Sequence, residues 1–154
     1  MAVIGATIGA LGETEAAHTF VEKNEAVLAQ AKASDAWANY QADSIKKHVY
    51  DLGAMLAAAP DAVQRLKDQS DKFAKEQPDI QATARKFERD VAEDGEKAER
   101  HFARHHTLAV AEGIVHAAIA GASIALLARR PALWWGSLAV TAAGIVVAIA
   151  AYAF

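Results

Sequence analysis

Three histidines and a glutamate are spaced along the second half of the chain so that they share one helix face. They are His101, His105, Glu112 and His116, at i, i+4, i+11 and i+15, and we call them the polar stripe. At about 3.6 residues per turn they fall within a wedge of roughly 60°. Neutral imidazole and carboxylate groups can relay protons or bind a divalent metal. They can also form hydrogen-bonded pairs that only fix contacts between helices, which is the interpretation we favour.

A ridge of small residues lies roughly opposite the polar stripe on the same expected helix. Ala117, Gly121 and Ala125 recur at every fourth position, a spacing that permits close helix packing in lipid. The helix is therefore expected to have neighbours on both sides. One is its hairpin partner. The other is a second subunit, a different protein or the apolar segment at the N-terminus.

A third candidate site is aromatic and lies far from the apolar C-terminal region. Trp37, Tyr40 and Ser44 share a helix face at i, i+3 and i+7. Aromatic side chains with polar tips are enriched at interfaces, so this face predicts an interhelical or subunit contact. A membrane-surface belt, packing within the stalk and a ligand site are the alternatives.

The elements that must position these groups include two apolar runs, residues 107–128 and 132–154. A bilayer core about 30 Å thick requires about 20 apolar residues per helix, and both runs reach that length. Since only a short turn containing two arginines separates them, they predict a transmembrane hairpin. Aromatic side chains near the ends of the second run are expected membrane anchors: Trp134, Trp135 and Tyr152.

Residues 13–106 are polar and rich in helix formers, and they predict an extramembrane helical stalk. Prolines 60 and 78 are expected to mark helix boundaries. The predicted helices cover about 13–59 and 61–77, and a third continues from Pro78 into the membrane. One apolar face of the first helix is expected to pack against the returning helices, and it carries Ile45, Val49, Leu52 and Leu56.

Residues 1–12 are apolar but too few to span a bilayer. They predict either the second half of a membrane helix whose start is truncated, or a membrane stub that enters the bilayer partway or packs against the hairpin. The expected fold is therefore all-α: an integral membrane protein with a long antiparallel helical stalk and a C-terminal two-helix transmembrane hairpin. The chain contains no cysteine, which excludes disulfides and thiolate ligands.

Three segments together resemble a bacterial family of small membrane proteins catalogued as domain of unknown function 4337. They are KASDAWANYQADSIKKHVYDL (32–52), ERHFARHHTLAVAEGIVHAAIA (99–120) and LLARRPALWWGSLAVTAAGIVV (126–147). The resemblance implies a first membrane helix, a charged helical stretch and a hairpin with an arginine-rich turn. Only residues 1–12 correspond to that first helix. The family carries no established activity to transfer.

The expected function is structural: a non-enzymatic scaffold, or an accessory subunit of a larger membrane complex. The alternatives are a small oligomeric proton or ion channel lined by the polar stripe and a metal-handling protein. The expected partners are the lipid bilayer and either further copies of the chain or a larger complex, with no nucleic acid and no cofactor. Two arginines in the hairpin turn favour a cytoplasmic turn, which places the stalk in the periplasm of a multi-pass inner-membrane protein. The alternative is a cytoplasmic stalk, which needs no complete first span and agrees with Lys97, Arg100 and Arg104 at the opposite end of the first membrane helix.

Overall fold

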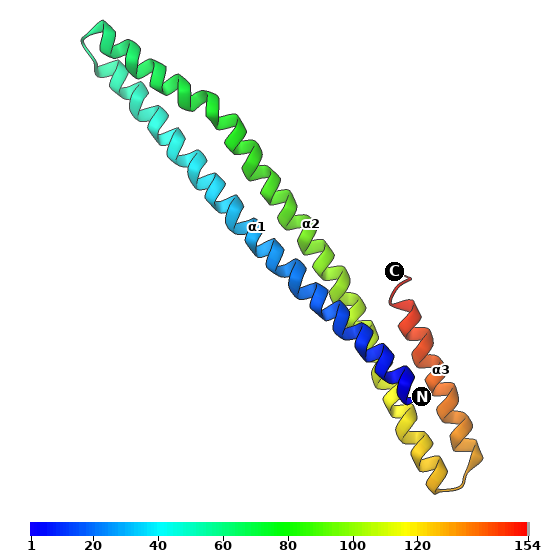
Figure 1. Cartoon of the computed structure of the whole chain (residues 1–154). Helices are drawn as coiled ribbons and strands as arrows, with labels where there is room; N and C mark the ends of the chain where they lie inside the picture. Colours follow the sequence, from blue (N-terminus) through cyan, green and yellow to red (C-terminus); the bar gives the residue numbers. More distant parts are fainter. Residues whose placement is uncertain (154) are drawn as a thin grey trace. The chain divides into compact units, whose positions relative to one another are not determined.

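The computed structural model describes residues 1–153 and contains three α-helices (Figure 1). They are α1 (Ala2–Leu56), α2 (Pro60–Leu127) and α3 (Pro131–Ala150). No strand occurs in the described residues, so the predicted all-α class is confirmed. The chain divides into two compact units, which we describe separately. Unit 1 comprises Met1–Lys23 with Gly95–Phe154, and unit 2 comprises Asn24–Asp94.

The first helix begins earlier than predicted. α1 starts at Ala2 rather than near residue 13, so the apolar stub forms the first turns of α1. Glycine in a helix interior costs roughly 0.5–1 kcal/mol relative to alanine, yet Gly5, Gly9 and Gly12 are all helical here. The close contacts that these glycines make with α2 offset that cost, and they are described with the candidate site.

The predicted boundary at Pro78 is wrong, because α2 runs through this residue without interruption. Proline removes one helical hydrogen bond and crowds the preceding turn, at a cost of about 3 kcal/mol. Contacts with α1 on both sides of the proline oppose that cost. Tyr50 and Phe73 stack with ring centroids 5.8 Å apart, and Ala84 is fully buried. Pro60 and Pro131 do begin helices, as expected of a residue with a preset φ.

Unit 2 is an antiparallel pair formed by α1 and the first part of α2, and its core is made of small side chains. The buried residues are Ala29, Ala33, Ala36, Ala54, Ser70 and Ala84. On α1 these positions belong to a repeat with alternating steps of three and four. We call this repeat the inner seam.

The larger apolar side chains of α1 do not join that core. Ile45, Val49, Leu52 and Leu56 are 64%, 61%, 57% and 78% exposed, so the prediction that they pack against the returning helix is wrong. They do share one helix face, as their spacing indicates. That face points away from α2 because the alanines occupy the opposite side of α1 and allow the two backbones to approach more closely than leucine would.

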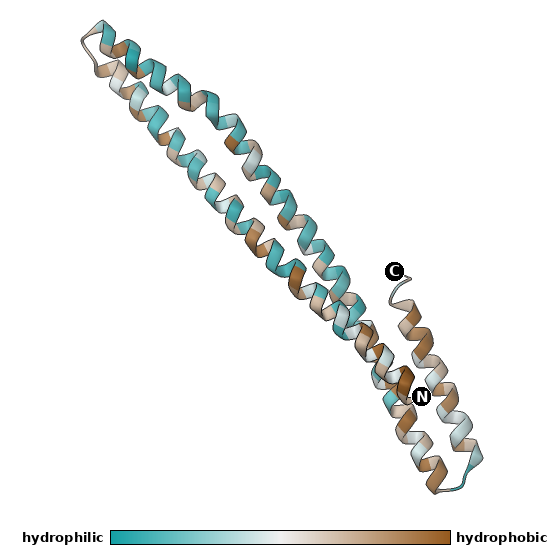
Figure 2. Ribbon diagram, viewed as in Figure 1, coloured by the Kyte–Doolittle hydropathy of each residue, from teal (hydrophilic) through white to brown (hydrophobic). Residues whose placement is uncertain are grey.

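Unit 1 contains the apolar core of the chain and its most hydrophobic helices. Ile8 of α1, Leu108, Ala111 and Val115 of α2, and Ala151 after α3 pack together. The end of α2 and most of α3 are hydrophobic (Figure 2). Among the described residues, α2 and α3 are the two helices long and apolar enough to cross a membrane.

The turn between α2 and α3 has a defined C-cap. Arg129 adopts a left-handed φ of 52°, and the Arg130 amide donates to the Ala125 carbonyl at 3.1 Å while the Arg129 amide donates to Leu126 at 3.3 Å. This hydrogen-bond pair is a Schellman motif. Pro131 then starts α3.

Candidate functional site

The polar stripe of α2 faces the first turns of α1 in unit 1. A Cβ atom placed on Gly9 would stand 2.7 Å from Glu112 Oε1, and one on Gly5 would stand 3.6 Å from His116 Nε2. The glycines therefore make room for the stripe's side chains. A second subunit, a different protein and the apolar N-terminal segment were the alternatives for the second neighbour of this helix. In the structure, the N-terminal segment of the same chain lies against the polar stripe.

His105 contacts the backbone of α1 directly. Its Nδ1 atom lies 2.9 Å from the carbonyl oxygen of Gly12. A carbonyl oxygen only accepts, so Nδ1 carries the hydrogen and Nε2 is the unprotonated nitrogen of the neutral ring. This contact fixes the tautomer and satisfies a helix carbonyl at the same time.

His101 pairs with an acidic residue that the sequence analysis did not single out. Its Nδ1 lies 2.5 Å from Glu15 Oε2, and Glu15 is only 7% exposed. The His18 ring stacks on His101 with centroids 5.0 Å apart. Glu15 continues the three-and-four spacing of the inner seam toward the N-terminus, and it lies four residues before the buried Thr19. This spacing could have identified Glu15 as a buried residue, but an acidic side chain in a polar helix is ordinarily expected to face solvent.

The deeper pair of the stripe is looser. His116 Nδ1 is 4.0 Å from Glu112 Oε1, with side chains 60% and 35% exposed. No three donor atoms of the stripe come within 4.8 Å of one another in the described structure. The stripe thus consists of separate paired contacts along the α1–α2 junction. This arrangement can pass a proton between partners, but it does not preform a three-ligand metal site.

The small-residue ridge faces α3. A Cβ on Gly121 would stand 2.9 Å from Ser137 Oγ, and Ala125 is 3% exposed while Ala117 stays exposed. On the opposite side of the contact, a Cβ on Gly144 would lie 2.8 Å from Val115 Cγ2. The apolar part of α2 therefore has α1 on one face and α3 on another, both from its own chain.

The Trp37 face packs against α2 within unit 2. Trp37 Nε1 donates to Glu88 Oε1 at 2.9 Å, and the Tyr40 ring meets the indole edge-on at 5.6 Å. Trp37, Tyr40 and Ser44 are each half-buried. This face of α1 therefore contacts α2 of the same chain, and its three side chains remain partly exposed.

The expected membrane anchors are all partly exposed. Trp134 is 45% exposed, Trp135 67% and Tyr152 47%. The Arg104 guanidinium lies 5.5 Å from the centroid of the Tyr152 ring, a cation–π contact. The hairpin prediction extended to residue 154, which lies outside the described residues.

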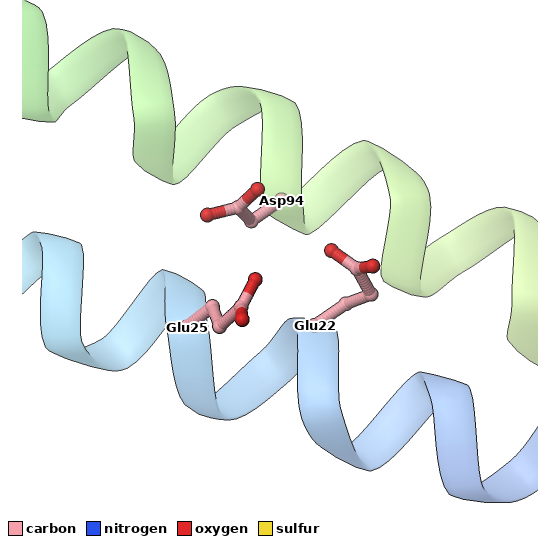
Figure 3. A group of neighbouring side chains, drawn as sticks. All are labelled: Glu22, Glu25 and Asp94. Carbon is pink, nitrogen blue, oxygen red and sulfur yellow. The ribbon is translucent and has the colours of Figure 1, made fainter.

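One acidic group was not anticipated from the sequence. Glu25 on α1 and Asp94 on α2 have carboxylate oxygens within 4.8 Å of each other, and Glu22 precedes Glu25 by one helical turn (Figure 3). Acidic side chains of this kind are common on solvated helix surfaces. Glu22 Oε2 is buried without a hydrogen-bond partner among the described residues, but the Glu22 side chain as a whole is only partly buried.

Comparison with known proteins confirms the family resemblance and adds no activity. No curated protein and no solved structure matches the chain. One family model matches residues 1–154, and its description is Domain of unknown function (DUF4337). The chain therefore belongs to the DUF4337 family.

Proposed function

We propose that this protein is a membrane-anchored helical protein that acts through helix–helix contacts, as a scaffold or as an accessory subunit, without enzymatic activity. The anchor would be the hairpin of α2 and α3. Only 22% of the most apolar window of either helix is buried within the chain. Leu126 and Leu127 at the end of α2 are 80% and 85% exposed. Such surface suits lipid far better than water.

The observation that carries the interaction role lies in unit 2. Every large hydrophobic side chain that is exposed within Asn24–Asp94 belongs to α1, whereas those of α2 are at least half-buried. One side of α1 thus presents an apolar face that its own chain leaves uncovered. A face of this kind outside the membrane indicates a protein partner.

The orientation of the protein can be proposed from the turn. Arg129 and Arg130 lie between the two candidate spans, and positive residues in short loops favour the cytoplasmic side. The helices of unit 2 would then lie in the periplasm of a bacterial inner membrane. The polar stripe would mark the level at which α1 joins the hairpin.

The absence of cysteine from the chain makes membrane insertion and orientation directly testable. Single Ser34→Cys and Ala128→Cys variants place a thiol on exposed positions of unit 2 and of the turn. A membrane-impermeant maleimide applied to intact spheroplasts should label position 34 alone, and both positions after permeabilisation. Release of the chain from membranes by alkaline carbonate would overturn the anchor.

The interaction role requires a second test. A photo-crosslinking amino acid at Leu52 in native membranes should give a covalent adduct. The matched control is Ala82, an exposed residue of α2 in the same unit, which should give none. Equal yields at both positions would contradict an interaction role for the apolar face of α1.

A second candidate function is proton or ion transfer along the polar stripe. The supporting observation is Glu112, a carboxylate within the apolar part of α2 with His116 beside it, because such groups are costly in lipid and are commonly functional. Purified protein in liposomes should then conduct protons, and Glu112→Gln should abolish the flux. Unchanged proton flux in that variant would contradict proton transfer along the polar stripe and would leave it only a role in helix packing. Metal handling, the other alternative, would require bound metal in the purified protein that is lost in His101→Ala.

A further inference from the structure

A second heptad repeat runs along α1 in unit 2, beside the inner seam and two residues out of step with it. Its members are Asn24, Leu28, Ala31, Asp35, Ala38, Ala42, Ile45, Val49, Leu52 and Leu56. The steps alternate four and three throughout, the spacing of the a and d positions of a coiled coil. We call this repeat the outer seam. A shift of two residues is about 200° of helix rotation, so the outer seam lies opposite the side that contacts α2.

Every member of the outer seam is exposed. Eight of its ten positions are apolar, and the four at the C-terminal end of α1 are large aliphatic residues between 57% and 78% exposed. A heptad repeat of this regularity is not needed for the contact with α2, which the inner seam already makes. Its regularity indicates a helical partner that lies along α1.

Charges beside the outer seam are compatible with a second copy of the same seam. In a parallel pair, each g position faces the e position of the following heptad on the other helix. The g positions of the outer seam carry no acidic residue, lysine or arginine: Val27, Ser34, Gln41, His48 and Met55. Lys32 and Lys46, which occupy e positions of the outer seam, therefore meet no lysine or arginine of the second helix.

The available area is also sufficient. The seam from Asn24 to Leu56 extends roughly 50 Å along a helix about 10 Å wide. Two such strips would bury roughly 1,000 Å² in total, which reaches the lower limit of a specific interface at about 1,000 Å².

From these observations we propose that two copies of the chain associate through the outer seam of α1 as a parallel, in-register pair. The orientation rests on the proposed membrane anchor, because α1 of two chains inserted the same way would leave the bilayer on the same side. Asn24, a d position, then faces Asn24 of the second copy and can hydrogen-bond with it, whereas a shift by one heptad would place it opposite Ala31. Asp35 faces its own copy and weakens the pair, so Asp35→Asn should strengthen association.

Disulfide formation in native membranes tests this arrangement in the full chain. Ala31→Cys and Ala42→Cys, made singly, should each give a disulfide-linked dimer under mild oxidation. A disulfide requires Cα atoms about 4.4–6.8 Å apart. An antiparallel pair can bring only one position of the seam against itself, so dimers at both positions report parallel, in-register packing. Ala82→Cys, which replaces an exposed alanine of α2, is the matched control and should remain monomeric.

A companion substitution separates specific packing from random collision. Leu52→Glu in the Ala42→Cys background should lower dimer yield roughly tenfold, the effect of about 1.4 kcal/mol, while Ala82→Glu should leave it unchanged. Leu52 is already exposed, so the fold of the single chain does not depend on it. Absence of disulfide dimers at positions 31 and 42 would overturn the proposal. If the disulfide dimers are absent but Leu52 gives a photo-adduct with another protein, the second copy is the wrong partner and the interaction role of α1 stands. Extraction of the chain by carbonate would instead contradict the proposed membrane anchor.

Discussion

At the residue scale, two glycines of α3 have opposite surroundings and give opposite predictions. A Cβ on Gly144 would stand 2.8 Å from Val115 Cγ2 and 3.2 Å from the Ala111 carbonyl oxygen, while no described neighbouring atom lies within 4 Å of one on Gly136. Gly144→Ala should cost about 1–3 kcal/mol through overpacking, and Gly136→Ala should gain up to about 1 kcal/mol through lower chain entropy. Unfolding in mild detergent followed by circular dichroism measures both. Equal effects would show that α3 does not pack on α2 as described.

Asp51 gives a prediction about pH. A hydrogen bond from Lys47 is the largest cause that lowers the pKa of Asp51 below its usual 3.8, and a hydrogen bond from the buried Ser70 is the second. A lowered folded pKa stabilises the fold fully above the unfolded pKa, and this contribution is lost as pH falls through the folded pKa. Carboxyl NMR titration should find the pKa of Asp51 below 3.8, and closer to that value in Ser70→Ala. An identical titration in both proteins would contradict the Ser70 contact.

The spacing of the polar stripe could be predicted from the sequence, but its partners could not. A period of about 3.6 residues places His101 and His105 on one face whatever lies opposite. The pairing with Glu15 and with the Gly12 carbonyl depends on the register between α1 and α2, which joins residues more than eighty positions apart. Local pattern carries no information on that register.

At the scale of elements, α1 carries two heptad repeats, and hydrophobicity alone selects the wrong one for the contact with α2. The inner seam is rich in alanine and includes Tyr50, which stacks on Phe73 of α2, so tight backbone approach and aromatic stacking replace large aliphatic side chains. Ile45 and Leu52 remain outside. The continuity of α2 through Pro78 was unpredictable for a related reason, since the compensating contacts come from another helix.

The turn between α2 and α3 yields a prediction for a single backbone angle. Arg129 has φ 52°, a left-handed conformation that costs a non-glycine residue roughly 1–2 kcal/mol. Arg129→Gly should therefore stabilise the hairpin by about 1 kcal/mol in detergent unfolding. Arg130→Gly removes the same charge at φ −107°, an N-cap position where glycine is tolerated within a few tenths of a kcal/mol. Stabilisation by both variants alike would indicate a charge effect and contradict the strain at Arg129.

At the scale of the whole molecule, the central claim is that a membrane-anchored chain associates with a second copy through the uncovered face of α1. The mass of the complex extracted gently from its native membrane, with every chain in it identified, tests that claim most directly. We expect twice the chain mass of 16.3 kDa for the wild type, and a roughly tenfold smaller share of that dimer for Leu52→Glu. A wild-type particle with the mass of a single copy of the chain would contradict association through α1.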